Sequence, residues 1–243
     1  MTQNKYIDIE VVDLFSVKGT ASCGSTPKTH SLKFLNTKTA PALIQEIFSD
    51  NYKVGEQKIE FAPKDIVLDL GANEGMFSIF MACFFPEIHI FAYEPIPATF
   101  ETLQENILLN GYENIITPVQ AGVGRPGRQW ATFNVSKDFS GGSTSMCIFN
   151  PEDHYLVKAP LISLDDIFLQ NDIQKCRLMK MDIEGMEYEA LYRATVLPLI
   201  DYTVMEVHMN SHLDYDGRRA DGLVTWLERQ TKLIHVDFCR MTD

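Results

Sequence analysis

The chain has 243 residues, of which 45% are hydrophobic, and this length and composition suit one compact globular domain with a sizeable core. Its formal net charge of -12 argues against a nucleic acid substrate, because phosphate contacts need a basic surface and the Lys and Arg residues are scattered. The amino terminus has no signal-peptide pattern and no apolar stretch has bilayer length, so we expect a cytoplasmic protein without a membrane span. The five cysteines contain no CxxC pair, so we expect neither a disulfide framework nor a structural zinc site.

Residues 1–61 have mixed periodicity, with one candidate helix through Leu43, Ile44 and Ile47. A regular alternation of strands and helices begins only after this segment. We therefore expect residues 1–61 to form an amino-terminal cover over one edge of a cleft. Residues 62–243 are expected to form the main domain, and the two parts together a single compact unit.

The first strong strand signal is Ile66–Leu70, which runs into a turn that carries Gly71, Asn73 and Gly75. Glycines at such a turn let a ligand approach the backbone, and the helix expected over 75–85 offers free N–H groups to it. The same glycine spacing also occurs in ordinary turns, so the turn needs support from elsewhere in the chain.

The composition of this turn distinguishes between two nucleotide cofactors. Dinucleotide-binding folds use GxGxxG, but here Asn73 replaces the middle glycine and Glu74 follows it, a carboxylate that would repel a pyrophosphate. S-adenosylmethionine has no phosphate and carries an ammonium and a sulfonium, so acids such as Asp69 and Glu74 are tolerable beside it. The turn therefore favours S-adenosylmethionine and leaves a nicotinamide-dependent oxidoreductase as the weaker alternative.

Support comes from Glu94, which ends the second apolar run at 88–93. An acid about 20 residues after the glycine turn sits where nucleotide-binding folds place the acceptor for two ribose hydroxyls. The alternative is an exposed acid at a strand end. A helix is expected over Pro97–Asn110, between a proline start signal and Gly111, and a third strand over 115–120.

The segment 122–161 interrupts the alternation with many Gly, Ser and Pro residues. Within it we expect a short hairpin strand over 130–135 and a flexible run over 140–145. Such an insertion is either a lid over a binding site or a plain surface loop.

Strands resume at 177–181, 202–208 and 233–238, separated by helices expected over 187–194 and through Leu223, Trp226 and Leu227. This order predicts an α/β fold with a doubly wound, mostly parallel sheet, helices on both faces and an inserted hairpin and loop region. Little chain follows residue 238, which leaves scant room for a final reversed strand.

Titratable residues gather where these later strands end, the edge at which open parallel sheets bind ligands. Lys180, Asp182 and Glu184 follow one strand, and alternation places Glu206 and His208 on one side of the next. The alternatives are amino-terminal helix caps for Asp182 and Glu184, and a hydrogen-bonded core histidine for His208. Because several carboxylates and a histidine converge, they could also chelate a divalent ion, but no spacing specifies one, so no metal site is assigned.

Four motifs in order resemble the FkbM family of methyltransferases, in the class I S-adenosylmethionine-dependent group, over about residues 52–208. The motifs are VLDLGANEGMFSI, Glu94-Pro95 before PATFETLQENILLNG, Ile162-Ser163-Leu164-Asp165-Asp166-Ile167, and Lys180-Met181-Asp182-Ile183-Glu184-Gly185-Met186-Glu187. The resemblance implies a Rossmann-like fold and S-adenosylmethionine as cofactor. By the resemblance, Asp69, Gly71, Asn73 and Gly75 face its methionine part, Glu94 its ribose and Gln120-Ala121 its adenine, while Asp182 and Glu184 border the methyl group and the acceptor, with His208 opposite.

The activity expected from this resemblance is methylation of a hydroxyl on a small molecule, a sugar or other glycan, or a secondary metabolite. We expect in-line methyl transfer with His208 as the base and with Asp182 or Glu184 orienting it, binding the acceptor or taking the proton instead. The alternative is a non-catalytic protein that binds S-adenosylmethionine. The sequence specifies neither the acceptor nor the oligomeric state.

Overall fold

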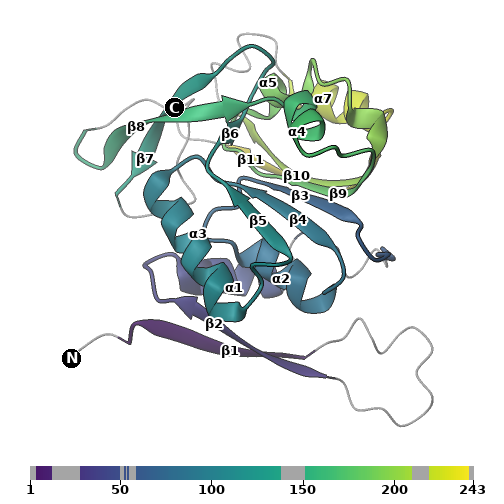
Figure 1. The fold of residues 1–243 in the computed structure, drawn as a ribbon. Coiled ribbons are helices and arrows are strands. Elements are labelled where there is room, and N and C mark those ends of the chain that lie inside the picture. Colours follow the sequence, from purple (N-terminus) through teal and green to yellow (C-terminus); the bar gives the residue numbers. More distant parts are fainter. Residues whose placement is uncertain are drawn as a thin grey trace.

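The computed structural model describes residues 4–12, 28–49, 52, 54, 59–137, 151–209 and 219–240. Its centre is a six-stranded sheet in which every strand pairing is parallel (Figure 1). The predicted doubly wound α/β fold is thus confirmed. The strands are β3 (Ile66–Leu70), β4 (His89–Tyr93), β5 (Ile116–Val119), β9 (Cys176–Met181), β10 (Ile200–Met209) and β11 (Lys232–Arg240), in the spatial order β11-β10-β9-β3-β4-β5.

Helices cover both faces of this sheet (Figure 1). Successive strand residues point to opposite faces, so Val67 joins the core on one side and Leu68 the core on the other. Burial on both faces explains why the strands are continuous apolar runs. One face carries α1 (Ala40–Phe48), α2 (Met76–Phe84) and α3 (Pro97–Asn110); the other carries α4 (Leu164–Gln170), α5 (Glu187–Leu191) and α7 (Ala220–Leu227), with the short 3-10 helix η3 (Leu197–Leu199) before β10.

The helix ends follow local sequence signals. Helix α3 has the predicted bounds, with Pro97 in its first turn and Gly111 in the left-handed region after its end. Helix α4 was not predicted, although the Ser163 side chain accepts a hydrogen bond from the Asp166 backbone N–H and caps it. Helix α5 ends at Leu191, three residues short of the expected bound. In the parts of the chain that the structure describes, no helix combines the length and apolar character needed to cross a membrane.

The amino-terminal segment contributes a hairpin that the sequence analysis did not predict. Strands β1 (Tyr6–Val12) and β2 (Thr29–Leu35) pair antiparallel beneath α1 and α3 (Figure 1). Two asparagines of α3 supply the bonds of a neighbouring strand: Asn106 Oδ1 accepts from Leu35 N at 2.8 Å and Asn110 Oδ1 from Lys33 N at 2.9 Å. Phe34 of β2 is buried in the same core as α2, so the hairpin packs against the helices on this face of the central sheet.

The inserted region forms a second, three-stranded sheet. It consists of β6 (Gly122–Val123), β8 (His154–Ile162) and β7 (Trp130–Ser136), in that order. Strand β7 confirms the predicted hairpin strand and pairs antiparallel with β8, whereas β6 runs parallel to β8. The run 140–145 lies outside the described residues. Phe133 of β7 packs with Leu161 and Met186, so this small sheet lies against the loop that follows β9.

Candidate functional site

The topology of the sheet selects one crevice. Strands β3 and β9 are neighbours, and from them the chain winds outward in opposite directions, which makes their carboxyl ends the switch point where such sheets bind ligands. The turn after β3 and the turn after β9 meet there, since Asp182 N donates to Leu70 O at 3.0 Å. A cleft opens between them, here called the switch-point cleft. It is lined by Gly71, Asn73, Glu94, Pro95, Ile96, Gly122, Val123, Phe133, Asp182, Ile183, Glu184 and Met186.

The structure gives a different reason for Gly71 than the one inferred from sequence. Its φ is +78°, and a Cβ built on it would lie 1.7 Å from the backbone oxygen of Asp182. Gly71 therefore admits the chain's own β9 turn, and it also lines the switch-point cleft. Gly75 has φ of +89° and begins α2, and a Cβ there would lie 2.5 Å from Leu103 Cδ1.

We expect Gly71→Ala to lower the free energy of unfolding by about 3 kcal/mol or more, because left-handed strain of roughly 1–2 kcal/mol adds to displacement of the Asp182 backbone. Gly111→Ala is the matched control: Gly111 has φ of +70°, but a Cβ there would meet no atom within 4 Å. Urea unfolding of the two variants measures the difference. Equal losses would show that the contact with Asp182 is unimportant.

Glu94 is buried beside the glycine turn and not exposed at a strand end. Its side chain is 6% exposed; Oε2 accepts from Asn73 N at 3.1 Å and Oε1 from Ile96 N at 2.8 Å. Burial raises its pKa to about 7, although the bonds from Ile96 and Asn73 oppose the shift. Both carboxylate oxygens are thus held at the wall of the cleft, where each retains capacity for a further donor.

Asp69 lies behind the turn, within the core of the sheet. It is fully buried, and its Oδ2 accepts from Ser78 Oγ at 2.7 Å. Lys180 Nζ lies 3.4 Å from Asp69 Oδ1 and donates to Gly71 O at 2.7 Å. Burial alone would lower the pKa of Lys180, but Asp69, Asp182 and Glu206 raise it above its ordinary value. Asp69 and Lys180 thus hold the glycine turn in place from the core of the sheet.

Glu74, the acid that argued against a pyrophosphate, faces the amino-terminal segment. Its carboxylate accepts from the Thr39 hydroxyl at 2.5 Å and from the Thr37 hydroxyl at 2.8 Å. Thr37 Oγ1 also accepts from Ala40 N at the start of α1. The glycine turn is thereby attached to α1, consistent with the expectation that this segment borders the crevice.

The two residues expected near an adenine, Gln120 and Ala121, do not line the switch-point cleft. Gln120 is exposed, and Ala121 is buried in the core with Tyr93. The next two residues along the chain, Gly122 and Val123, line that end of the cleft instead. The role expected for Gln120 and Ala121 stays a prediction.

A second cleft, here called the inner cleft, lies on the other side of the glycine turn and shares Gly71, Asn73, Asp182 and Glu184 with the first. Leu43 and Ile47 of α1 line it. Its remaining lining residues include Tyr52, Glu74, Lys180, Glu206, His208 and Cys239. The ends of β9, β10 and β11 thus converge on one cavity.

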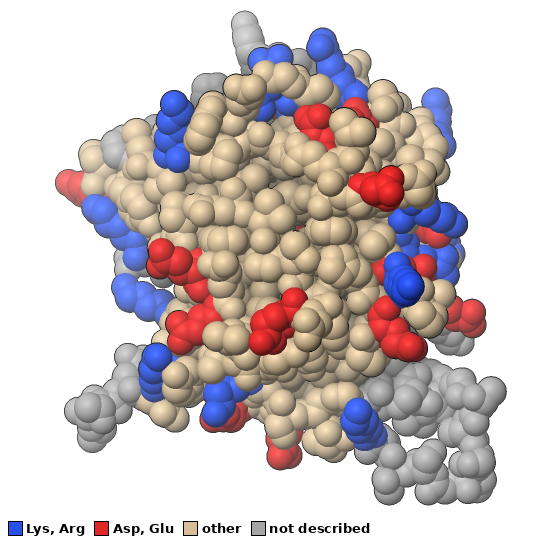
Figure 2. Space-filling view, in the orientation of Figure 1, with Lys and Arg blue, Asp and Glu red and all other residues tan. Residues whose placement is uncertain are grey.

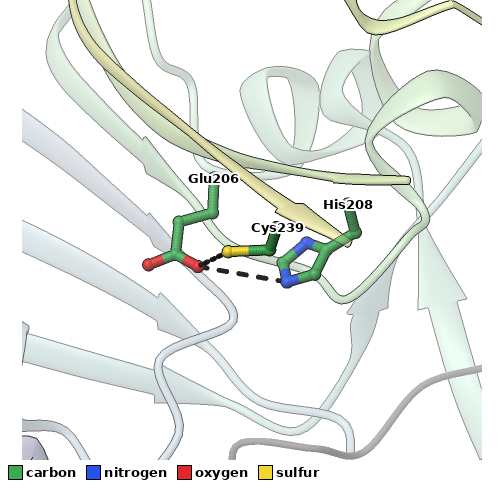
Figure 3. A group of neighbouring side chains, drawn as sticks. All are labelled: Glu206, His208 and Cys239. Carbon is green, nitrogen blue, oxygen red and sulfur yellow. Dashed lines mark hydrogen bonds and ion pairs between the residues drawn. The ribbon is translucent and has the colours of Figure 1, made fainter. Parts of the chain in front are cut away.

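Four of these residues, Asp182, Glu184, Glu206 and His208, form what we call the carboxylate–histidine cluster. His208 is 4% exposed, and its Nε2 lies 3.3 Å from Glu184 Oε2, 3.9 Å from Asp182 Oδ1 and 4.0 Å from Glu206 Oε2. The predicted placement of Glu206 and His208 on one side of β10 is confirmed, and Figure 3 shows both pointing to the same space. The alternative of a bonded core histidine accounts for the burial but not for three carboxylates at Nε2.

The other ring nitrogen, Nδ1, lies 2.9 Å from Glu187 Oε1. Burial would lower the pKa of His208, but the Glu187 bond and the charges of Glu187, Glu184 and Asp182 raise it to about 10. Burial and Asp182 raise the pKa of Glu184 to about 8. In the free protein the cluster therefore retains bound protons, which reduce the repulsion between its carboxylates.

Two further residues complete the surroundings of the cluster. Cys239 of β11 lies opposite His208 in the strand register and donates from Sγ to Glu206 Oε2 at 3.2 Å (Figure 3). Tyr52 places its hydroxyl 3.2 Å from Asp182 Oδ2 and 3.4 Å from Glu206 Oε1. Burial raises the pKa of the Tyr52 hydroxyl, so it stays a donor between the two carboxylates.

The alternative of helix caps for Asp182 and Glu184 is not realised. Met186 occupies the cap position of α5 and makes no side-chain capping bond. Glu187, which is fully buried, instead folds back so that its Oε1 accepts from Gly185 N at 3.1 Å. Glu184 has φ of +53°, which turns the chain so that its carboxylate faces His208.

On the face shown in Figure 2, Lys and Arg side chains are spread around the outline and interleaved with Asp and Glu. A nucleic-acid-binding face would gather them into one stripe or patch.

Comparison with known proteins gives a consistent result. The family model described as the methyltransferase FkbM domain matches residues 69–234, from the acid before the glycine turn into β11. The 31-O-demethyl-FK506 methyltransferase FkbM of Streptomyces tacrolimicus is 25% identical over 217 residues, which cover 79% of this chain and 81% of that protein. The hexuronic acid methyltransferase AglP of Haloferax volcanii is 25% identical over 172 residues, which cover 68% and 67%.

Among solved structures, the precorrin-6y C5,15-methyltransferase of Geobacter metallireducens aligns with a TM-score of 0.43 at 14% identity, over 74% of this chain and 71% of that chain.

Proposed function

Because the chain belongs to the FkbM family of methyltransferases, we propose that it transfers the methyl group of S-adenosylmethionine to a hydroxyl oxygen on a small molecule or a glycan. The observation that carries this proposal is Glu94, a buried carboxylate at the switch-point cleft, where nucleotide-binding sheets hold a ribose. The relatives named for 31-O-demethyl-FK506 and for hexuronic acid support an oxygen-bearing organic acceptor of this kind.

The proposed cofactor lies across the two clefts. Its ribose hydroxyls donate to Glu94, and its adenine lies against the apolar wall that includes Val123, Phe133 and Met186. Its sulfonium lies beside Asp182, where the switch-point cleft meets the inner cleft. Negative charge at that junction stabilises the sulfonium. The acceptor then occupies the inner cleft, bordered by Asp182, Glu184 and His208.

In the proposed reaction the acceptor oxygen attacks the methyl carbon opposite the sulfur. The new O–C bond forms as the C–S bond breaks, sulfur keeps the electron pair and becomes the neutral thioether of S-adenosylhomocysteine, and the hydroxyl proton passes to the carboxylate–histidine cluster. Alignment of the two reactants supplies most of the acceleration. Proton transfer within the cluster adds about 10²- to 10⁴-fold.

The proposal predicts that S-adenosylhomocysteine binds and that its affinity falls in acid. Ribose hydroxyls donate to the ionised carboxylate, so binding must displace the proton that Glu94 holds below its pKa of about 7. The charges of Lys180 and Asp69 act on the pKa of Glu94 in opposite directions. We expect the affinity to drop by about tenfold per pH unit below pH 7 and to be constant above it. Calorimetric titration between pH 5.5 and 8 measures this, with Glu94→Gln as the control whose weaker affinity does not vary with pH. No binding by the unmodified protein at any pH would reject the proposed cofactor.

Turnover separates an enzyme from a protein that only binds the cofactor. Incubation with methyl-labelled S-adenosylmethionine and a panel of hydroxylated metabolites and glycans is expected to transfer label to at least one acceptor. Mass spectrometry then identifies the methylated oxygen. Tight binding of the cofactor without transfer to any member of a broad panel would favour the non-catalytic alternative.

A further inference from the structure

We propose that the carboxylate–histidine cluster is a binding site for one divalent cation, with Asp182, Glu184 and His208 Nε2 as its ligands and Glu206 as a neighbouring carboxylate. The ligand atoms of Asp182, Glu184 and His208 all lie within 4.8 Å of one another. They come from the ends of two neighbouring strands, β9 and β10, at the floor of the inner cleft. The spacing of the motifs specifies no ion, because it is the sheet that brings these residues together.

The donor spacing is that of a coordination shell. Two ligand atoms at roughly 2.1 Å from one ion are separated by about 3.0 Å when they are cis and about 4.2 Å when they are trans. The three carboxylate oxygens lie 3.3, 3.9 and 4.0 Å from His208 Nε2, between these limits. A small inward movement of the side chains would therefore place the donors of Asp182, Glu184 and His208 on one ion.

One buried atom at the centre of the cluster lacks the bond that burial normally demands. Asp182 Oδ1, which faces His208 Nε2 at 3.9 Å, is shielded from solvent and has no hydrogen-bond partner in the described part of the chain. A cation between Asp182 and His208 would satisfy this oxygen.

Glu187 supplies the second shell that a metal-binding histidine requires. Its Oε1 is 2.9 Å from His208 Nδ1, so Nδ1–H donates to Glu187, and an ion that displaces the Nε2 proton would meet the Nε2 lone pair on the side of the three carboxylates. Around this one ring, the four carboxylates of Asp182, Glu184, Glu187 and Glu206 all lie within 4.0 Å of a nitrogen. Lys180 divides its charge between Asp69 and Asp182, so the cluster has an excess of negative charge.

The donor chemistry points to an ion such as Mn²⁺. Oxygen ligands with one imidazole suit Mn²⁺ and similar ions, whereas a soft thiolate would favour Zn²⁺. Cys239 Sγ is occupied by its bond to Glu206 Oε2 at 3.2 Å, and it does not belong to the group of Asp182, Glu184 and His208. The inference rests on the proposed function only for the role of the ion, which would bind the acceptor oxygen at an open coordination position and promote loss of its proton.

The test is titration of the purified chain with Mn²⁺, followed by electron paramagnetic resonance and calorimetry. One saturable site is expected. Glu184→Gln and Asp182→Asn keep the side-chain shapes, and we expect each to weaken Mn²⁺ binding by about 100-fold or more, with Glu187→Gln costing about 10- to 100-fold through its effect on His208. Asp237→Asn is the matched control, since Asp237 pairs with His235 in an isolated contact of 2.8 Å, and it should leave the affinity unchanged.

Two parallel measurements separate this inference from the proposed function. Glu94→Ala should lose S-adenosylhomocysteine but keep Mn²⁺, and thermal unfolding checks that each variant is folded. Absence of saturable Mn²⁺ binding in a protein that binds S-adenosylhomocysteine would overturn the metal site alone. Binding that survives Glu184→Gln and Asp182→Asn, or that is lost in Cys239→Ser, would overturn the assigned ligands.

Discussion

Replacement of Glu94 by alanine is expected to weaken binding of S-adenosylhomocysteine by about 10²- to 10⁴-fold, since two hydrogen bonds to a charged acceptor contribute roughly 1.5–3 kcal/mol each. Both oxygens of Glu94 are oriented in advance by Asn73 N and Ile96 N. A ligand therefore meets an acceptor whose side-chain entropy is already lost. Calorimetric titration at pH 8, where the carboxylate is ionised, measures the full effect.

The same substitution removes two bonds to backbone N–H groups, so loss of binding must be separated from loss of structure. Glu94→Gln keeps one acceptor oxygen and the shape of the side chain, and we expect it to bind S-adenosylhomocysteine at an affinity between those of the unmodified protein and Glu94→Ala. Hydrogen exchange at Asn73 and Ile96 reports on the local fold. Unchanged affinity in Glu94→Ala with a folded turn would mean that the ribose lies elsewhere.

The central sheet was predictable because each strand is buried on both faces. Val67 and Leu68 pack into different cores, so the strand needs apolar residues at every position and is visible as a continuous run. The position of Glu94 was predictable for a related reason, because the first charged residue after an apolar run marks the end of the strand. The parallel arrangement then brings strand ends to one edge, and with them Asp182 and His208.

The hairpin of β1 and β2 shows where local patterns fail. Residues Tyr6–Val12 alternate in burial between half-buried and exposed, and β2 is held by the side chains of Asn106 and Asn110, far away in the sequence. Gly71 shows a second failure. Its turn was predicted at the right position, but the structure requires a glycine there because the backbone of Asp182, which follows β9, lies against it.

Residues that reach the cluster from elsewhere in the fold carried no signal at all. Glu187 reads as an acid in the first turn of a helix, and only the bend at Glu184 and Gly185 brings it beneath His208. Tyr52 and Cys239 arrive from opposite ends of the chain to contact the same Glu206 carboxylate. Such contacts depend on tertiary packing, so a single sequence does not reveal them.

His208→Asn is expected to reduce turnover by about 10²- to 10⁴-fold once an acceptor is identified, because the variant loses a ligand for the ion that activates the acceptor or, without an ion, the positive charge that stabilises the proton-accepting carboxylates. The affinity for S-adenosylhomocysteine should change little, since the proposed ribose and adenine contacts lie in the switch-point cleft on the other side of the glycine turn. The signature is a fall in kcat, measured in single turnovers with the cofactor saturating.

His235→Asn is the matched control for this variant. His235 also lies on a strand of the central sheet and bonds a carboxylate, Asp237, but it lines neither cleft. Loss of a buried histidine that is paired with carboxylates changes stability as well as chemistry, so both variants are compared at a temperature where thermal unfolding shows them folded. Equal turnover in His208→Asn and His235→Asn would remove His208 from the reaction and leave the carboxylates of Asp182 and Glu184 to accept the proton unaided.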